Sequence, residues 1–184
     1  MLLNSELIEL LAAFEKFKVR YLVIGGYAVG HHAEPRSTKD LDVWIGTDRK
    51  NAHALYRALA EFGAPLSGGP DMFEDKDSIY WFGFPPNRVD ILMAPQGAPL
   101  FDDAWRRRVK AEVDGVNVTV VSRDDLIALK ELADRPVDRR DIKALRAADK
   151  AATAAKSKSA PTAKKSVRRK QKKKAKRASR RGAR

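Results

Sequence analysis

The chain has 184 residues, of which 33% are charged and 43% hydrophobic, and its formal net charge is +13. This length accommodates one domain of ordinary size and an additional segment, and the absence of Cys excludes disulfides and thiolate metal sites. The first residues lack the basic region and apolar core of a signal peptide, and no apolar run approaches the ~20 residues of a membrane span. We therefore expect a soluble, cytoplasmic protein that does not associate with a membrane.

The positive charge is concentrated at the C-terminal end. Residues 150–184 hold 16 of the 37 Lys and Arg and no Asp or Glu, so the 21 remaining cations face all 24 acidic residues within 1–149. The C-terminal segment has almost no large apolar residue, and it therefore cannot bury enough surface to offset its chain entropy. We predict a folded domain over 1–149 and a disordered, Lys/Arg/Ala-rich tail over 150–184.

Helices and strands are expected to interleave along the domain. Apolar residues at helical spacing and the capping residues Asp48 and Ser122 mark the helices, and short apolar runs mark the strands. In chain order we predict a helix over 5–17, a strand over 21–24, a brief helix over 27–32, a strand over 41–45, a helix over 49–62, a loop over 63–70, strands over 79–84 and 88–93, a helix over 100–109, strands over 111–113 and 116–121, a helix over 122–133, and a last helix that Asp138 caps and that ends near Ala148.

Turn residues define how the later strands pair. Pro85-Pro86-Asn87 is short enough to make the two flanking strands an antiparallel pair, and Asp114-Gly115 is a favoured two-residue hairpin turn. Arg135-Pro136 ends the helix before it. Helices mixed with antiparallel or mixed strands favour an α+β fold, with a small mixed sheet flanked by helices.

Asp40-Leu41-Asp42 is the most informative local pattern. Carboxylates at i and i+2 of a strand project from the same face. They repel each other unless a divalent cation lies between them, which suggests phosphoryl-transfer chemistry. Gly25-Gly26 follows an earlier strand and lets backbone N–H groups approach a phosphate closely.

Three segments, taken in chain order, resemble the nucleotidyltransferase superfamily of the polymerase beta type. They are Gly25-Gly26-Tyr27-Ala28, Arg36-Ser37-Thr38-Lys39-Asp40-Leu41-Asp42 and Arg88-Val89-Asp90-Ile91. The hallmark of that superfamily is a Gly-Gly turn, an Asp-x-Asp pair and a third carboxylate on a neighbouring strand. Within it, the sequence resembles the small prokaryotic branch that includes nucleotidyltransferase-like toxins of abortive-infection and toxin-antitoxin systems. Lys130 and the stretch from Arg135 to Asp141 match later motifs of that branch, and the resemblance covers about residues 20–146.

The resemblance implies a site and a reaction. Asp40, Asp42 and Asp90 would hold two Mg²⁺ ions, and Asp90 would also accept the proton of the attacking hydroxyl. The catalytic set would be completed by Lys130, which neutralises phosphate charge. The nucleotide would be bound by the residues Gly25, Gly26, Arg36 and Thr38. The reaction implied is in-line attack on the α-phosphate of an NTP, with transfer of a nucleoside monophosphate to an acceptor.

The expected acceptor is RNA, such as a tRNA end, because a flexible arm of charge +16 binds polyanions at low salt. A protein side chain or a small molecule such as an aminoglycoside is the alternative acceptor, and an antitoxin protein is a further expected partner.

Tyr27 stands where many superfamily members have Ser, which leaves open a noncatalytic nucleotidyltransferase-like module. A histone-like nucleic-acid binder, in which the tail is the function, is a third reading.

Ordinary structural roles remain open for several of these residues. Asp90 can pair with Arg88 or Arg36 in a surface ion pair, and Lys130 can be a solvent-facing helix residue. Asp138 and Asp141 can act as a helix N-cap and its reciprocal partner.

Overall fold

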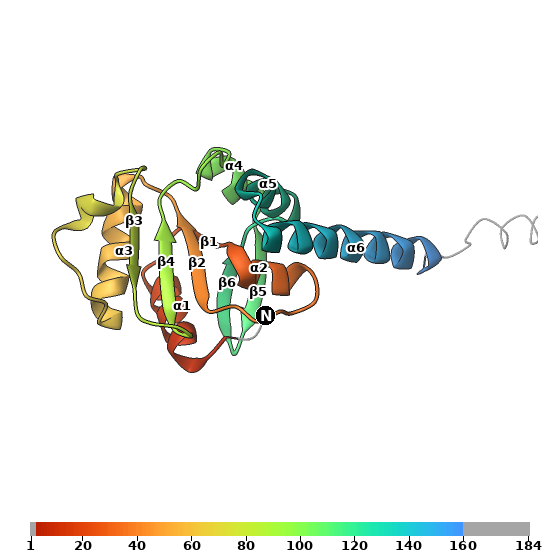
Figure 1. Ribbon diagram of the computed structural model, residues 1–184. Coiled ribbons are helices and arrows are strands. Elements are labelled where there is room, and N and C mark those ends of the chain that lie inside the picture. The colour runs from red at the N-terminus through yellow and green to blue at the C-terminus, as the bar shows by residue number, and fades with distance from the viewer. Residues whose placement is uncertain (1–2, 160–184) are drawn as a thin grey trace, which may run out of the picture. The chain divides into compact units, whose positions relative to one another are not determined.

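A mixed sheet of six strands forms the centre of the fold, with the strands in the order β3-β4-β2-β1-β6-β5 (Figure 1). The computed structural model describes residues 3–159. Its contacts define one compact unit that ends at Ala148 and a second that begins at Asp149. The strands are β1 (Tyr21–Val23), β2 (Asp40–Ile45), β3 (Ile79–Phe82), β4 (Arg88–Leu92), β5 (Val109–Val113) and β6 (Val116–Val120).

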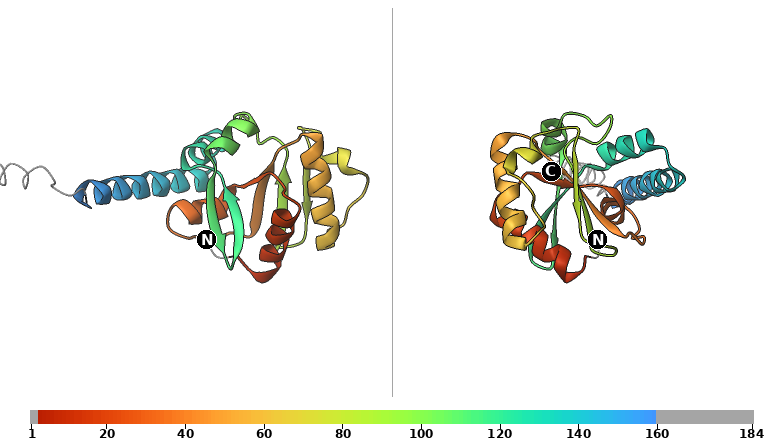
Figure 2. Two further views of the ribbon diagram at one scale, coloured as in Figure 1. Left: turned by 180° about the vertical axis from the view of Figure 1, so that it is seen from behind. Right: turned by 60° about the vertical axis from the view of Figure 1, so that its left-hand side comes forward.

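Helices cover both faces of the sheet. Helices α1 and α3 pack together on one face, whereas α2 and α5 lie on the other (Figure 2, right). The helices are α1 (Ser5–Lys16), α2 (Gly25–His32), α3 (Arg49–Phe62), α4 (Phe101–Arg107), α5 (Arg123–Ala133) and α6 (Pro136–Ser159), with a short 3-10 helix η1 (Pro70–Phe73). The predicted α+β fold with a small mixed sheet flanked by helices is confirmed.

Side-chain alternation along β2 separates the core from the polar face. Leu41 and Val43 are fully buried, while Asp40 and Asp42 are only partly buried. The ring of Phe82, on β3 of the same sheet, contacts Phe62 of α3. Phe82 pairs in register with Val89, which is the neighbour of Leu41 across β4 and β2. The apolar side chains of these strands therefore face α3, and the carboxylates face the opposite side of the sheet.

Two predicted helix caps are confirmed. The Asp48 side chain accepts a hydrogen bond from the backbone N–H of Asn51 at 3.1 Å at the start of α3. Ser122 accepts one from the backbone N–H of Asp125 at 3.2 Å at the start of α5. Each bond satisfies a backbone donor that has no partner within the helix.

Several boundaries differ from the sequence-based expectation. Helix α2 begins at Gly25 rather than residue 27, and α4 ends at Arg107 because Val109 already pairs with Val120 in the sheet. Asp138 does not cap α6, because that helix begins at Pro136, where a missing N–H costs nothing.

Helix α6 also extends beyond its predicted end. It continues past Ala148 to Ser159, since residues 149–159 are rich in Ala and Lys, which favour helix, and contain no Gly or Pro. The first ten residues of the predicted disordered tail are therefore helical. The rest of that prediction, residues 160–184, falls outside the described residues. Within residues 3–159, no helix combines the length and the apolar character needed to cross a membrane.

Candidate active site

Three carboxylates converge on the polar face of the sheet. Asp40 and Asp42 come from β2 and Asp90 from the parallel neighbour β4, where Asp42 and Asp90 are directly paired in register. One carboxylate oxygen from each of the three lies within 4.8 Å of the others. Parallel pairing of two strands thus brings together residues about 50 positions apart in the sequence. Three hard oxygen donors at this spacing are the ligands that Mg²⁺ prefers in proteins.

The electrostatics of the cluster favour a bound cation. Burial, together with the charges of Asp40 and Asp90, raises the pKa of Asp42 to about 6, although Lys130 and Arg135 act in the opposite direction. A divalent cation between the three groups would replace this repulsion by attraction. The residues present therefore fit the divalent-metal site that the sequence pattern predicts.

Gly25 and Gly26 bring the start of α2 against these carboxylates. Gly25 has φ +61°, and a Cβ atom there would lie 1.8 Å from Oδ2 of Asp42. A Cβ at Gly26 would lie 2.5 Å from Oγ1 of Thr38. Only residues without a side chain allow the first turn of the helix to approach β2 this closely. The positive end of α2 therefore lies beside the acidic cluster, as an anionic phosphate would require.

Thr38 and Arg36 lie on the loop that precedes β2. The Thr38 hydroxyl donates a hydrogen bond to Oδ1 of Asp40 at 3.1 Å, which orients that carboxylate. Arg36 instead makes a two-point contact with Asp141 of α6, with Nε and Nη2 at 2.8 and 2.9 Å from its two oxygens. Thr38 is thus directly connected to the acidic cluster, whereas the guanidinium of Arg36 is paired with Asp141.

Lys130 on α5 is buried and not solvent-facing. Only 5% of the residue is exposed, and its Nζ lies 3.0 Å from Oδ1 of Asp138 and 2.8 Å from Oδ2 of Asp141. Because Asp141 also binds Arg36, one carboxylate connects α5, α6 and the loop before β2. The ammonium group is therefore held in one position on the cavity side of α5.

Asp138 supports this arrangement without being the N-cap of α6. Its carboxylate is fully buried and accepts hydrogen bonds from the backbone N–H of Arg135 at 3.3 Å and from Nε of Arg135 at 2.6 Å. Burial would raise the pKa of Asp138, but the hydrogen bonds from Arg135 and Lys130 outweigh it and lower the pKa to about 2. Arg135 was absent from the predicted site, although the Arg-Pro-x-Asp spacing placed it one turn from Asp138.

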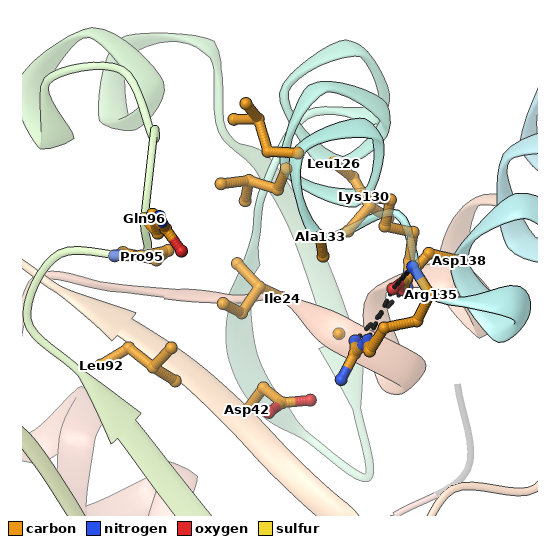
Figure 3. Close-up of a pocket in the computed structure, with 13 residues that line it drawn as sticks. Ile24, Asp42, Leu92, Pro95, Gln96, Leu126, Lys130, Ala133, Arg135 and Asp138 are labelled. Atoms are coloured by element: carbon orange, nitrogen blue, oxygen red, sulfur yellow. Dashed lines mark hydrogen bonds and ion pairs between the residues drawn. The ribbon is translucent and has the colours of Figure 1, made fainter.

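A cavity of about 300 Å³ opens between the acidic cluster and α5. Figure 3 shows Asp42 on one side of this cavity and the pair Arg135–Asp138, with Lys130 above them, on another. The remaining wall contains Gly25 and Gln96 but is largely apolar, and its apolar side chains are those of Ile24, Leu92, Pro95, Leu126, Leu129, Leu132 and Ala133. An opening with an acidic cluster, two cations and apolar walls suits a ligand that carries both phosphate and an apolar ring.

Tyr27 does not line this cavity. It lines a second hollow of about 310 Å³ together with Arg36, Ser37 and Thr38. Burial raises the pKa of the Tyr27 hydroxyl, and the charge of Asp40 adds to this effect. The bulky side chain is therefore accommodated beside the cluster rather than within the cavity that Asp42 lines.

Comparison with known proteins gives a consistent picture. A family model described as a nucleotidyltransferase of unknown function (DUF6036) matches residues 2–175. No curated protein matches the sequence.

Three solved structures share the fold. The lincomycin-bound lincosamide antibiotic adenylyltransferase LnuA has a TM-score of 0.55 at 17% identity, over 79% of this chain and 97% of that one. A nucleotidyltransferase-like protein from Paracoccidioides brasiliensis has a TM-score of 0.51 at 19% identity, over 78% and 77%. The antibiotic-resistance factor ANT(2'')-Ia has a TM-score of 0.50 at 16% identity, over 80% and 82%.

Proposed function

Because the chain belongs to this nucleotidyltransferase family, we propose that it transfers a nucleoside monophosphate from an NTP to a hydroxyl group of RNA, in a reaction that depends on Mg²⁺. The observation that carries the proposal is the convergence of Asp40, Asp42 and Asp90 within 4.8 Å, beside the glycine-initiated start of α2. Clustered acids lower stability in the absence of a cation, so their presence argues for a metal-dependent activity rather than a structural role.

Each residue of the site has a role in this proposal. Asp40, Asp42 and Asp90 would hold two Mg²⁺ ions, which supply charge neutralisation and polarise phosphate oxygens when bound. Gly25 and Gly26 leave room for the triphosphate at the positive end of α2. Asp90 is the carboxylate farthest along the sheet from α2, and it accepts the proton of the attacking hydroxyl.

Lys130 and Arg135 counter the charge of the leaving pyrophosphate from the opposite wall of the cavity. Their partners Asp138 and Asp141 keep them in place, since each carboxylate contacts Lys130 within 3.0 Å. Thr38 orients Asp40 through its 3.1 Å hydrogen bond. Arg36 acts indirectly, because its ion pair holds Asp141, which in turn contacts Lys130.

RNA is the proposed acceptor because of the charge of the chain. Thirteen Lys and Arg and no acidic residue lie in 160–184, and such a segment attracts a polyanion independently of its sequence. A reaction between NTP and RNA is expected in the cytoplasm. A role as the toxin of a toxin-antitoxin system, with an antitoxin as partner, rests on the sequence resemblance alone.

The test is a transfer assay with each of the four α-labelled NTPs, Mg²⁺, and total cellular RNA and protein as acceptors. We expect label to appear in RNA with the wild-type protein and to be absent with Asp40→Asn and with Asp42→Asn. Label in the protein fraction would show that the acceptor is a protein and not RNA. If no label moves and calorimetry detects no Mg²⁺-dependent NTP binding, the proposal is wrong and the noncatalytic module is the better description.

A small-molecule acceptor is the second candidate, favoured by the fold shared with LnuA, an adenylyltransferase of lincosamide antibiotics. The same assay with lincomycin in place of RNA separates the two, because the product then migrates as a small adduct. Truncation after Ser159 adds a further comparison. An enzyme that acts on RNA keeps its intrinsic turnover and loses affinity for long RNA, whereas a histone-like binder loses its function altogether.

A further inference from the structure

The edge strand β3 exposes large apolar side chains beside the acidic cluster. Trp81 pairs in register with Asp90, and Ile79 pairs with Leu92, so all four residues share one face of the sheet. Trp81 is 56% exposed and Ile79 61% exposed. Leu92 also lines the cavity that contains Asp42. An apolar surface thus continues from the cavity across β4 to the edge of the sheet.

This surface lies on the open side of the site. Helices α2 and α5 lie over the β1 and β6 side of the sheet, and in Figure 1 no helix of residues 3–148 lies over the corresponding face of β3 and β4. If the triphosphate occupies the side of α2 and Lys130, the attacking hydroxyl must come from the side of Asp90, because the entering and leaving oxygens are in line. That approach passes over Trp81.

Arg88 connects the aromatic ring to the acidic cluster. Its Nε donates a hydrogen bond to Oδ1 of Asp90 at 2.7 Å, and its guanidinium carbon lies 4.9 Å from the centre of the Trp81 ring. Within the described residues, the Nη1 and Nη2 groups of Arg88 make no hydrogen bond. The same residue therefore orients Asp90, packs on Trp81 and retains two amino groups, with four N–H donors, for an anion.

We propose that Trp81 and Arg88 form the acceptor subsite, in which the 3′-terminal base of an RNA stacks on the exposed indole of Trp81 and the adjacent phosphate binds the guanidinium of Arg88. This inference rests on the proposed nucleotidyl transfer, and it assigns the position at which the RNA acceptor of that reaction binds. A flat aromatic face accepts any base, and base stacking on an aromatic side chain is the usual means of holding single-stranded RNA.

The charge of the subsite favours RNA over a polycationic small molecule. The guanidinium of Arg88 would repel a cationic acceptor beside the indole of Trp81. The side chains of Ile79, Trp81 and Leu92 are uncharged, and Asp90 on the same face is already paired with Arg88. RNA, in contrast, has a phosphate one nucleotide away from its terminal base. The basic residues of 160–184 would raise the local concentration of the same ligand.

The test uses the full-length protein with Trp81→Ala, Trp81→Phe and the matched control Phe84→Ala. Phe84 is an aromatic residue that is 81% exposed and lies beyond the last paired residue of β3. The first measurement is the yield of photocrosslinking to an oligoribonucleotide with 4-thiouridine at its 3′ end, with the crosslinked peptide identified. The second is the KM for a trinucleotide acceptor, and the third is calorimetric binding of Mg²⁺ and NTP.

We expect crosslinking to a peptide that contains Trp81, and a KM about 5- to 160-fold higher for Trp81→Ala, the range that one stacked base contributes. Trp81→Phe should recover most of the loss, and Phe84→Ala should change neither value. NTP binding should be equal in all variants.

Unchanged KM and crosslinking in Trp81→Ala, with NTP binding intact, would overturn the subsite but leave nucleotidyl transfer standing. An equal loss in Phe84→Ala would also overturn it, as would a dimer in sedimentation that Trp81→Ala dissociates, because the edge of β3 would then bind a second copy. Absence of NTP binding in the wild type would instead show that the proposed function itself is wrong.

Discussion

The carboxylate of Asp42 occupies the space that a side chain at Gly25 would need. A Cβ atom on Gly25 would lie 1.8 Å from Oδ2 and 2.6 Å from Cγ of Asp42, and the backbone of Gly25 has φ +61°. The glycine that starts α2 and the second carboxylate of the Asp-x-Asp pair therefore depend on each other. This contact explains in physical terms why the two patterns occur together in one sequence.

Gly25→Ala should abolish nucleotidyl transfer and lower the free energy of unfolding by about 3 kcal/mol, because backbone strain and a displaced Asp42 carboxylate add together. Gly63→Ala is the matched control, since Gly63 also has positive φ, +87°, but open space around its Cβ. We expect Gly63→Ala to lower the free energy of unfolding by about 1 kcal/mol, from backbone strain alone. Chemical denaturation and the transfer assay measure both effects. Equal losses in the two variants would show that the contact with Asp42 is unimportant.

Asp42→Asn should make the metal-free protein more stable at neutral pH while it abolishes transfer. The pKa of Asp42, about 6, is above the 3.8 of an ordinary aspartate, so between these values the folded protein retains a proton that the unfolded chain has lost. The free energy of unfolding therefore falls as pH rises through this window, by at most about 3 kcal/mol.

Urea denaturation in EDTA at pH 4.5 and pH 7.5 measures this fall, which Asp42→Asn should remove and the exposed-site control Asp77→Asn should retain. Addition of Mg²⁺ at pH 7.5 should stabilise the wild type and not Asp42→Asn. A wild-type protein that is equally stable at both pH values would contradict the prediction.

Lys130→Met should lower the free energy of unfolding by about 3 kcal/mol, because it leaves the buried carboxylates Asp138 and Asp141 with one cationic partner fewer. Lys143 on α6 is exposed, and Lys143→Met should change stability by less than about 0.5 kcal/mol. Thermal unfolding of the three proteins at pH 7.5 makes the comparison. If Lys130→Met unfolds at the wild-type temperature, the ammonium group is not held between the two aspartates as described.

Asp138→Asn should remove part of the acid sensitivity of the fold. The pKa of Asp138 is lowered to about 2, so its ion pairs stabilise the folded state above pH 4. This contribution to the free energy of unfolding, about 2 kcal/mol, is lost as the pH falls towards 2. Wild-type protein should lose this amount between pH 5 and pH 2 in urea titrations, and the variant should be less stable at pH 5 but change less with pH. Parallel pH profiles would contradict the assignment.

Local sequence patterns predicted most of the fold. Capping by Asp48 and Ser122, the hairpin turn at Asp114-Gly115 and the periodicity of the apolar residues depend on neighbours within a few positions, and these predictions agree with the structure. The start of α6 was misplaced because Asp is a common N-cap residue. In the structure Asp138 is the third residue of the helix, and its carboxylate accepts a hydrogen bond from the backbone N–H of Arg135.

The candidate site was only partly visible in the sequence. The spacing of Asp40 and Asp42 indicated that they share one face of a strand, but the sequence did not indicate that Lys130 is buried. A helical Lys is usually solvated, and only the tertiary structure places Asp138 and Asp141 of α6 around the buried ammonium group of Lys130. Arg36 was predicted to bind nucleotide, and the structure adds that its guanidinium is paired with Asp141.

The sequence by itself determined most of the secondary structure, the paired carboxylates of β2, the membership of the nucleotidyltransferase superfamily and the charge of the C-terminal segment, because each depends on composition or on spacing along the chain. Only the tertiary structure decided which distant residues meet. Parallel pairing of β2 with β4 brings Asp90 to Asp42, and the edge position of β3 leaves Trp81 exposed beside it. Strand order and register depend on how the whole sheet packs between its helices, and no local segment contains that information.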